Sequence, residues 1–221
     1  MKKILLITVA LLFLFGCSKE SSLSPASVTT IHPETKVTAT QETDLREYQE
    51  LLSYNDTGNW IPFTLGCIFE KPQDIDLEFM FYSGTAELGW HSISSASEAE
   101  LIHAGFWREM DLQVMPVSSL NDALRQTLGI TLTDVKIPES WYYLSAEDAY
   151  CSNNNDAYYI GPVTVTSVTK YNDGTAEVHY QVDSYYNTKT GEFLDETCLL
   201  LTLWQDGDEW VVYSNFIESV G

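Results

Sequence analysis

The strongest constraint on the fold is a strict alternation of apolar and polar residues late in the chain. Residues 176–183 alternate in this way, and a period of two places successive side chains on opposite faces of a β-strand. Further strands are predicted at 163–171, 193–204 and 209–217, each bounded by a turn sequence such as Asn172-Asp173-Gly174. Four strands joined by three short turns predict an antiparallel meander. The last two carry apolar residues on both faces, so we expect them to be central or covered.

The segments before this sheet have a helical period. Helices are predicted within 42–53 and 74–82 and from Ser119 to Gly129, and Ser97 with Glu100 has the spacing of a capping box at a further helix start. Helices followed by a meander are the order of an α+β fold. We therefore expect N-terminal helices packed on a curved antiparallel four-stranded C-terminal meander.

The N-terminus has the parts of a bacterial export signal. Lys2 and Lys3 supply positive charge, residues 4–15 are apolar apart from Thr8, and Gly16 precedes Cys17. The run Leu14-Phe15-Gly16-Cys17 resembles the lipobox of bacterial lipoproteins. This resemblance implies that residues 1–16 are a signal peptide, that they are removed, and that the Cys17 thiol carries a lipid.

Two alternatives to lipidation are an uncleaved membrane span and an ordinary secretory signal with a coincidental cysteine. Twelve helical residues reach about 18 Å, whereas a hydrocarbon core is about 30 Å thick, which disfavours a span. The coincidence of a short apolar run, a small residue and a cysteine favours lipidation over the second alternative. The localisation we expect is the outer face of the cell membrane, with the lipid as the membrane partner.

The remaining chain divides by composition. Residues 17–41 hold the lipidated cysteine and a flexible tether, since Ser and Thr are frequent there and no apolar period is sustained. Residues 42–221 are expected to form a single α+β domain, with a sub-boundary considered near 135–160.

Acidic residues dominate the charge of the chain. It has 32 Asp and Glu against 11 Lys and Arg, a formal net charge of −21, and loss of Lys2 and Lys3 with the signal would make the remainder more negative. Such a surface repels phosphate backbones, so nucleic acid is excluded as a partner. Solubility explains the acidity most simply, and cationic partners or divalent ions remain compatible with it.

Three cysteines remain once Cys17 is assigned to lipid. An exported protein can form disulfides, and three thiols allow at most one pair. Cys151 with Cys198 is the candidate pair to test first, because one precedes the meander and the other lies inside it. Cys67 stands in an apolar stretch and is expected to be a buried small hydrophobic residue.

No recognised cofactor, metal or nucleophile motif occurs in the chain. The histidines are isolated from one another: His32, His91, His103 and His179. HExxH, GxSxG and glycine-rich phosphate loops are absent. Asp206, Asp208 and Glu209 cluster at one turn but lack the spacing of a calcium-binding loop, so we interpret them as hairpin residues rather than a cation site. We expect no catalytic residue, no metal and no cofactor.

Aromatic residues are the enrichment that could carry binding. The candidates surround a polar turn: Trp141, Tyr142, Tyr143, Tyr158 and Tyr159. Planar rings bind sugar faces, peptides and cationic groups, and Tyr adds a hydroxyl. The alternative, which we favour, is packing in a β-rich core and at its edge.

Two resemblances extend this interpretation. The final hairpin, with Asp208-Glu209-Trp210-Val211-Val212, resembles the closing strands of NTF2-like or cystatin-like domains. Residues 65–77 and Trp141-Tyr142-Tyr143-Leu144 are similar to uncharacterised lipoproteins of Gram-positive gut anaerobes. The second resemblance implies the cellular location of a lipoprotein and a small soluble domain, and it implies no activity.

Three functions are compatible with the sequence. The first is a non-enzymatic, lipid-anchored module that binds an envelope protein, peptide or glycan at the cell surface. The second is an envelope hydrolase or isomerase with a sheet-lined acid/base pocket that uses Glu177, His179 and Asp183. Alternation places these three side chains on the solvent face, which argues against the second. The third is a purely structural role in envelope assembly.

Overall fold

The structure is a computed structural model that describes residues 38–54, 59–84, 94–105, 112–153, 160–187 and 190–221. These residues belong to one compact unit, Thr35–Gly221. The predicted signal peptide, Cys17 and most of the predicted tether lie outside the described residues, as do Tyr158 and Tyr159.

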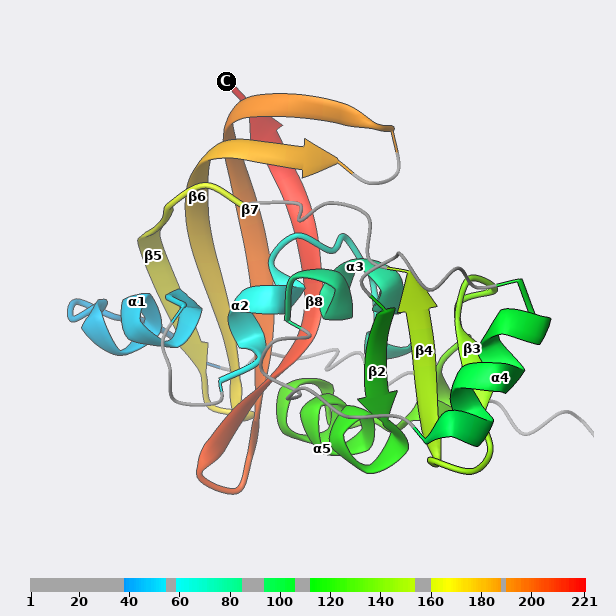
Figure 1. The fold of residues 1–221 in the computed structure, drawn as a ribbon. Helices are drawn as coiled ribbons and strands as arrows, with labels where there is room; N and C mark the ends of the chain where they lie inside the picture. The colour runs from blue at the N-terminus through cyan, green and yellow to red at the C-terminus, as the bar shows by residue number, and fades with distance from the viewer. Residues whose placement is uncertain (1–37, 55–58, 85–93, 106–111, 154–159, 188–189) are drawn as a thin grey trace, which may run out of the picture. The chain divides into compact units, whose positions relative to one another are not determined.

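The main sheet is antiparallel throughout and has five strands among the residues described (Figure 1). In sheet order the strands are β1 (Ala39–Gln41), β5 (Val163–Tyr171), β6 (Thr175–Asn187), β7 (Glu192–Asp206) and β8 (Glu209–Val220). The four strands of the predicted meander are confirmed, but the prediction of a four-stranded sheet is wrong. The fifth strand, β1, lies at the end of the segment assigned to the tether, and its three exposed residues have no apolar period that could reveal it.

The register of the sheet confirms the predicted alternation. Val178 pairs with Leu201 and both are buried on the inner face, whereas His179 pairs with Leu200 on the outer face. β7 is central, as predicted, with partners on both sides. β8 is instead an edge strand, whose far side meets only an isolated bridge between Phe69 and Asn215 in the described part of the chain. Two bulges between β7 and β8 interrupt the pairing and alter which face the β8 side chains occupy.

The helices precede the meander, and the fold is mixed α+β. They are α1 (Arg46–Leu52), α2 (Ile61–Thr64), α3 (Leu77–Gly84), α4 (Ser95–His103) and α5 (Val117–Leu128), with short 3₁₀ turns η1 (Pro72–Asp74) and η2 (Leu132–Asp134). Leu52 from α1 and Phe63 from α2 share one hydrophobic core with Val178 of the sheet. α5 ends as predicted at Gly129, whose φ of 65° is left-handed.

The start of α4 corrects the predicted capping box. The N-cap is Ser94, whose hydroxyl oxygen accepts a hydrogen bond from the Ser97 backbone N–H at 3.2 Å. Ser97 is itself buried in the first turn, and its hydroxyl donates to a Glu147 carboxylate oxygen at 2.9 Å. The helix therefore begins before Ser97, because a second serine three residues earlier has the same capping chemistry.

A second antiparallel sheet was not predicted. It contains β2 (Leu112–Pro116), β4 (Ala149–Asn153) and β3 (Tyr142–Leu144), in that order. Figure 1 shows α4 beside this sheet, and Leu101 of α4 shares a small separate core with Leu144 and Cys151.

A buried polar cluster fixes the irregular segment 65–69 to the main sheet. Asn215 on β8 has no exposed surface, and its amide donates to the carbonyl oxygens of Leu65 at 3.1 Å and Cys67 at 2.9 Å. Its Oδ1 accepts from the Tyr180 hydroxyl at 2.9 Å. The Tyr185 hydroxyl donates to the Gly66 carbonyl oxygen, also at 2.9 Å. We call these residues the Asn215 cluster.

Candidate ligand pocket

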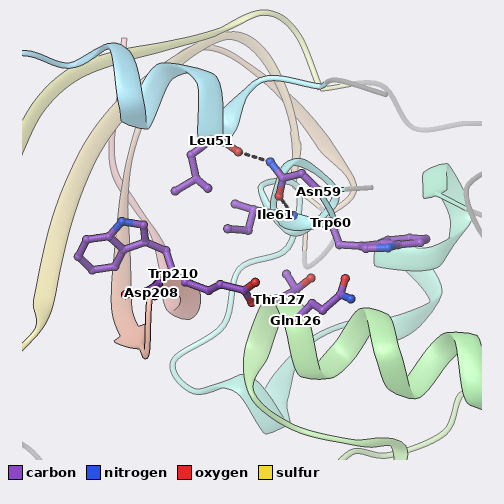
Figure 2. A pocket seen from close by; sticks show the side chains of 9 residues that line it. Leu51, Asn59, Trp60, Ile61, Gln126, Thr127, Asp208 and Trp210 are labelled. Carbon is purple, nitrogen blue, oxygen red and sulfur yellow. Dashed lines mark hydrogen bonds between the residues drawn. The ribbon is translucent and has the colours of Figure 1, made fainter. Parts of the chain in front are cut away.

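A pocket of about 440 Å³ opens between the last hairpin, the start of α2 and the end of α5 (Figure 2). It is lined by Leu51, Asn59, Trp60, Ile61, Gln126, Thr127, Asp208, Glu209 and Trp210. Its volume is within the range of small-molecule sites in proteins. In Figure 2 the indoles of Trp60 and Trp210 lie at opposite ends, with Ile61 between them.

Asn59 and Trp60, which directly precede α2, form one wall of the pocket. The Asn59 side-chain amide donates to the Leu51 carbonyl oxygen at 2.7 Å, and its Oδ1 accepts from the Ile61 backbone N–H at 3.0 Å. Asn59 is therefore occupied in joining the two helices. Trp60 is buried against Phe63 and Phe81, with ring centroids 5.2 and 5.5 Å away.

The hairpin wall is held in place through Trp210. Its indole N–H donates to a Glu47 carboxylate oxygen at 3.3 Å, and its ring lies 6.1 Å from that of Tyr48 on α1. The Lys170 ammonium lies 5.3 Å from the Tyr48 ring and 6.0 Å from the Trp210 ring, within reach of cation–π attraction. These contacts fix the hairpin against α1 and leave the indole half-buried beside the pocket.

Thr127 on the last turn of α5 has a buried hydroxyl without a hydrogen-bond partner in the described part of the chain. The residue is only 1% exposed, and its Oγ1 makes no hydrogen bond to any other described residue. A buried hydroxyl without a partner costs about 1–3 kcal/mol, and most buried hydroxyls are therefore paired. Figure 2 shows Thr127 and Gln126 beside the pocket. The hydroxyl oxygen is itself covered, so a molecule in the pocket can supply the missing partner only if the side chains over it move aside.

Two carboxylates make the pocket acidic. Asp208 and Glu209 are exposed and have no ion-pair partner within the described ranges. No lysine or arginine is among the described residues that line the pocket. The interpretation of Asp206, Asp208 and Glu209 as hairpin residues is confirmed, since β7 ends at Asp206 and β8 begins at Glu209. The sequence did not reveal that two of them also border a pocket.

The predicted aromatic candidates do not form one surface. Trp141 is 8% exposed and packs on Phe81 and Tyr150, with centroids 6.1 and 5.8 Å away. Tyr142 donates a hydrogen bond to Glu100 at 3.1 Å, whereas its neighbour Tyr143 is 44% exposed and donates to Asp148 at 2.8 Å. Adjacent residues of a strand point to opposite faces, so Tyr142 and Tyr143 are separated. Tyr158 and Tyr159 lie outside the described residues.

The predicted acid/base trio also lies away from the pocket. Asp183 is exposed, while Glu177 and His179 are half-buried on the outer face of the main sheet. His179 Nδ1 is 2.7 Å from a Glu218 carboxylate oxygen, and Glu177 accepts from the Tyr171 hydroxyl at 2.5 Å. None of the three lines the pocket.

The predicted disulfide between Cys151 and Cys198 is absent from the structure. Cys67, Cys151 and Cys198 are free thiols in the described part of the chain. Cys151 lies in β4 of the second sheet and Cys198 in β7 of the main sheet. The pairing was expected because Cys151 was placed next to the meander, and the second sheet that holds it was not foreseen. Burial raises the pKa of Cys151 to about 11 and raises that of Cys67 well above its ordinary value. Both buried thiols are therefore protonated and unreactive near neutral pH.

No group of three or more His, Cys, Asp or Glu residues in the described ranges could hold a metal ion. Among the helices described, none has both the length and the apolar character to cross a membrane. Comparison with protein-family models, curated proteins and solved structures finds no match for this chain. The NTF2-like, cystatin-like and lipoprotein resemblances stay predictions.

Proposed function

We propose that this protein is a lipid-anchored, extracytoplasmic binding module that holds a small ligand in the pocket of Thr127, Asp208, Glu209 and Trp210. The observation that carries the proposal is the buried, unpartnered Thr127 hydroxyl in the wall of an open pocket. A ligand that hydrogen-bonds to this group would recover part of the free energy lost by burying it.

An unpaired hydroxyl alone would not support a site. Thr197 Oγ1 is also buried without a partner among the described residues, and it does not line the pocket. At Thr127 the unpaired hydroxyl coincides with a volume of about 440 Å³ and with two carboxylates that have no ion-pair partner among the described residues. It is this coincidence that points to binding.

The anchoring part of the proposal rests on the lipobox-like run that ends at Cys17. A single acyl chain binds membranes only marginally, so stable attachment requires two or more chains. The Ser- and Thr-rich segment after Cys17 would then separate the domain from the lipid surface.

Replacement of Cys17 by Ser tests the anchoring. We expect the variant to accumulate as an uncut precursor without lipid, as measured by intact mass and by incorporation of labelled fatty acid. Normal processing and membrane retention of Cys17→Ser would contradict the proposal.

Thermal unfolding in the presence of envelope extracts tests the binding. A ligand at a hundred times its Kd adds about 2.7 kcal/mol of stability, which for a domain of this size raises Tm by about 5–10 °C. We expect a digest of bacterial cell wall, or the soluble small molecules around it, to raise Tm of the wild-type chain and of Thr197→Val but not of Thr127→Val. An equal rise in both valine variants would exclude the pocket as the site.

A further inference from the structure

We infer that the pocket selects a primary ammonium group on a short alkyl stem, such as one end of a diamine or the side chain of a lysine residue. The inference rests on the proposed function and names the ligand class of the same pocket. It depends on three properties of the lining: the sign of its charge, the chemistry of its unpaired hydroxyl and the position of its apolar side chains.

The charge of the lining favours a cation. Asp208 and Glu209 supply two carboxylates, and the described lining residues include no basic side chain to balance them. Lys170, whose ammonium lies 6.0 Å from the Trp210 ring, is not part of the lining and lies 3.8 Å from a Glu42 carboxylate oxygen. The chain carries a net charge of −21, so its overall field also attracts cations and repels anions.

The hydroxyl distinguishes between kinds of organic cation. A primary ammonium has three N–H donors, enough for the two carboxylates and for Thr127 Oγ1. A quaternary ammonium has none and would leave the buried hydroxyl unpaired, which weakens binding. A neutral alcohol could pair with Thr127 but would leave both carboxylates without a counter-charge.

The apolar side chains of the lining favour a ligand with an alkyl stem. Leu51 and Ile61 lie between the ends of the pocket, and the half-buried Trp210 ring lies at one of them (Figure 2). Methylene groups next to these side chains would be removed from water while the charged end meets the carboxylates.

A series of five-carbon probes tests the inference on the full chain purified in detergent. The probes are 1,5-diaminopentane, its bis-trimethylammonium analogue, 1,5-pentanediol and glutarate, which share a stem and differ at the ends. We expect calorimetry to show binding of the diamine with 1:1 stoichiometry, and at least tenfold weaker binding of the other three. Nα-acetyl-lysine methylamide, compared with the diamine, shows whether a lysine residue or a free diamine fits better, and tight binding of either supports the inference.

Matched variants locate the binding. Thr127→Val, Asp208→Asn and Glu209→Gln should each weaken diamine binding about tenfold, whereas Thr197→Val should change it less than twofold. Thr127→Val retains the side-chain shape and removes only an unpaired hydroxyl, so it should fold. If it fails to fold, the two carboxylate variants, which change exposed side chains, decide the same question.

Several results would overturn the inference. These are diamine binding no tighter than that of the diol, equal binding by the two valine variants, binding of no probe, or calcium chloride binding that needs the carboxylates but not Thr127. If an envelope extract still raises Tm in a Thr127-dependent way, the ligand class is wrong and the proposed binding function survives. If neither the probes nor the extracts act at Thr127, both fail.

Discussion

Buried polar side chains are hydrogen-bonded in the Asn215 cluster but not at Thr127 beside the pocket. Asn215 is fully buried, and its side chain makes three hydrogen bonds within the protein. Thr127 is almost as buried and makes none with the described residues. A satisfied buried network stabilises and specifies a fold, whereas an unsatisfied group destabilises it unless another molecule completes it. The difference separates a polar group that holds the structure from one that is available for function.

The location of each group explains the difference. Segment 65–69 is irregular, so the Leu65 and Cys67 carbonyls need donors from outside the segment, and the Asn215 amide supplies them. Thr127 instead lies in the last turn of α5, next to an open volume.

The largest expected effect on stability is that of the Asn215→Ala substitution. It leaves two carbonyl oxygens and the Tyr180 hydroxyl without their partner in the core, so we expect the free energy of unfolding to fall by about 3–4 kcal/mol. Urea unfolding followed by circular dichroism measures it. A loss below about 1 kcal/mol would show that the cluster does not hold the segment.

A smaller loss of stability is expected for Tyr185→Phe. The substitution removes only the donor to the Gly66 carbonyl oxygen and retains the buried ring, so we expect a loss of about 1–2 kcal/mol. The same urea titration measures it, with Tyr143→Phe as the control. The Tyr143 hydroxyl is bonded at the surface, and its removal should cost under about 0.5 kcal/mol. Equal losses in the two variants would contradict the assigned role of the cluster.

At Thr127 we expect a change in the free energy of unfolding of the opposite sign. Thr127→Val removes an unpaired hydroxyl and retains the shape of the side chain, so stability should stay constant or rise by about 1 kcal/mol. Thr197→Val should behave in the same way, and only Thr127→Val should lose ligand binding. Destabilisation by more than about 1 kcal/mol in ligand-free Thr127→Val would mean that the hydroxyl has a structural partner.

Thiol labelling tests, without a stability measurement, whether the Asn215 cluster keeps Cys67 buried. Because burial raises the pKa of Cys67 and Cys151, both should resist iodoacetamide in the native chain at pH 8, while the half-exposed Cys198 is alkylated. Mass spectrometry of peptides identifies the labelled sites. Cys67 should become more reactive in Asn215→Ala, because segment 65–69 loses its two bonds to Asn215 and can open to expose the thiol. A Cys151–Cys198 disulfide in native protein would contradict the structure.

The sequence allowed the meander to be predicted because its strands are long and separated by clear turn sequences, and because residues 176–183 alternate. The limits of β5 were predicted correctly, since the turn Asn172-Asp173-Gly174 follows it directly. β1 and β3 have three residues each, too few for a period to be visible. Ser94 and Ser97 offer the same capping chemistry, and only the fold selects between them.

The pocket could not be predicted because it is assembled from distant segments. Asp208, Glu209 and Trp210 were visible as a hairpin, but their partners Ile61 and Thr127 are far away in the chain and carry no motif. An unpaired hydroxyl is also invisible in a sequence, since nothing distinguishes Thr127 from a paired threonine until its neighbours are known.

Strand β8 carries both Asn215 and Trp210, five positions apart, so one wall of the pocket is continuous with the strand that the Asn215 cluster ties to segment 65–69. A surface that is already immobile loses little conformational entropy when a molecule arrives, which makes weak individual contacts sufficient for recognition. The Trp210 ring also provides an intrinsic fluorophore at that surface, through which occupancy could be followed without a label.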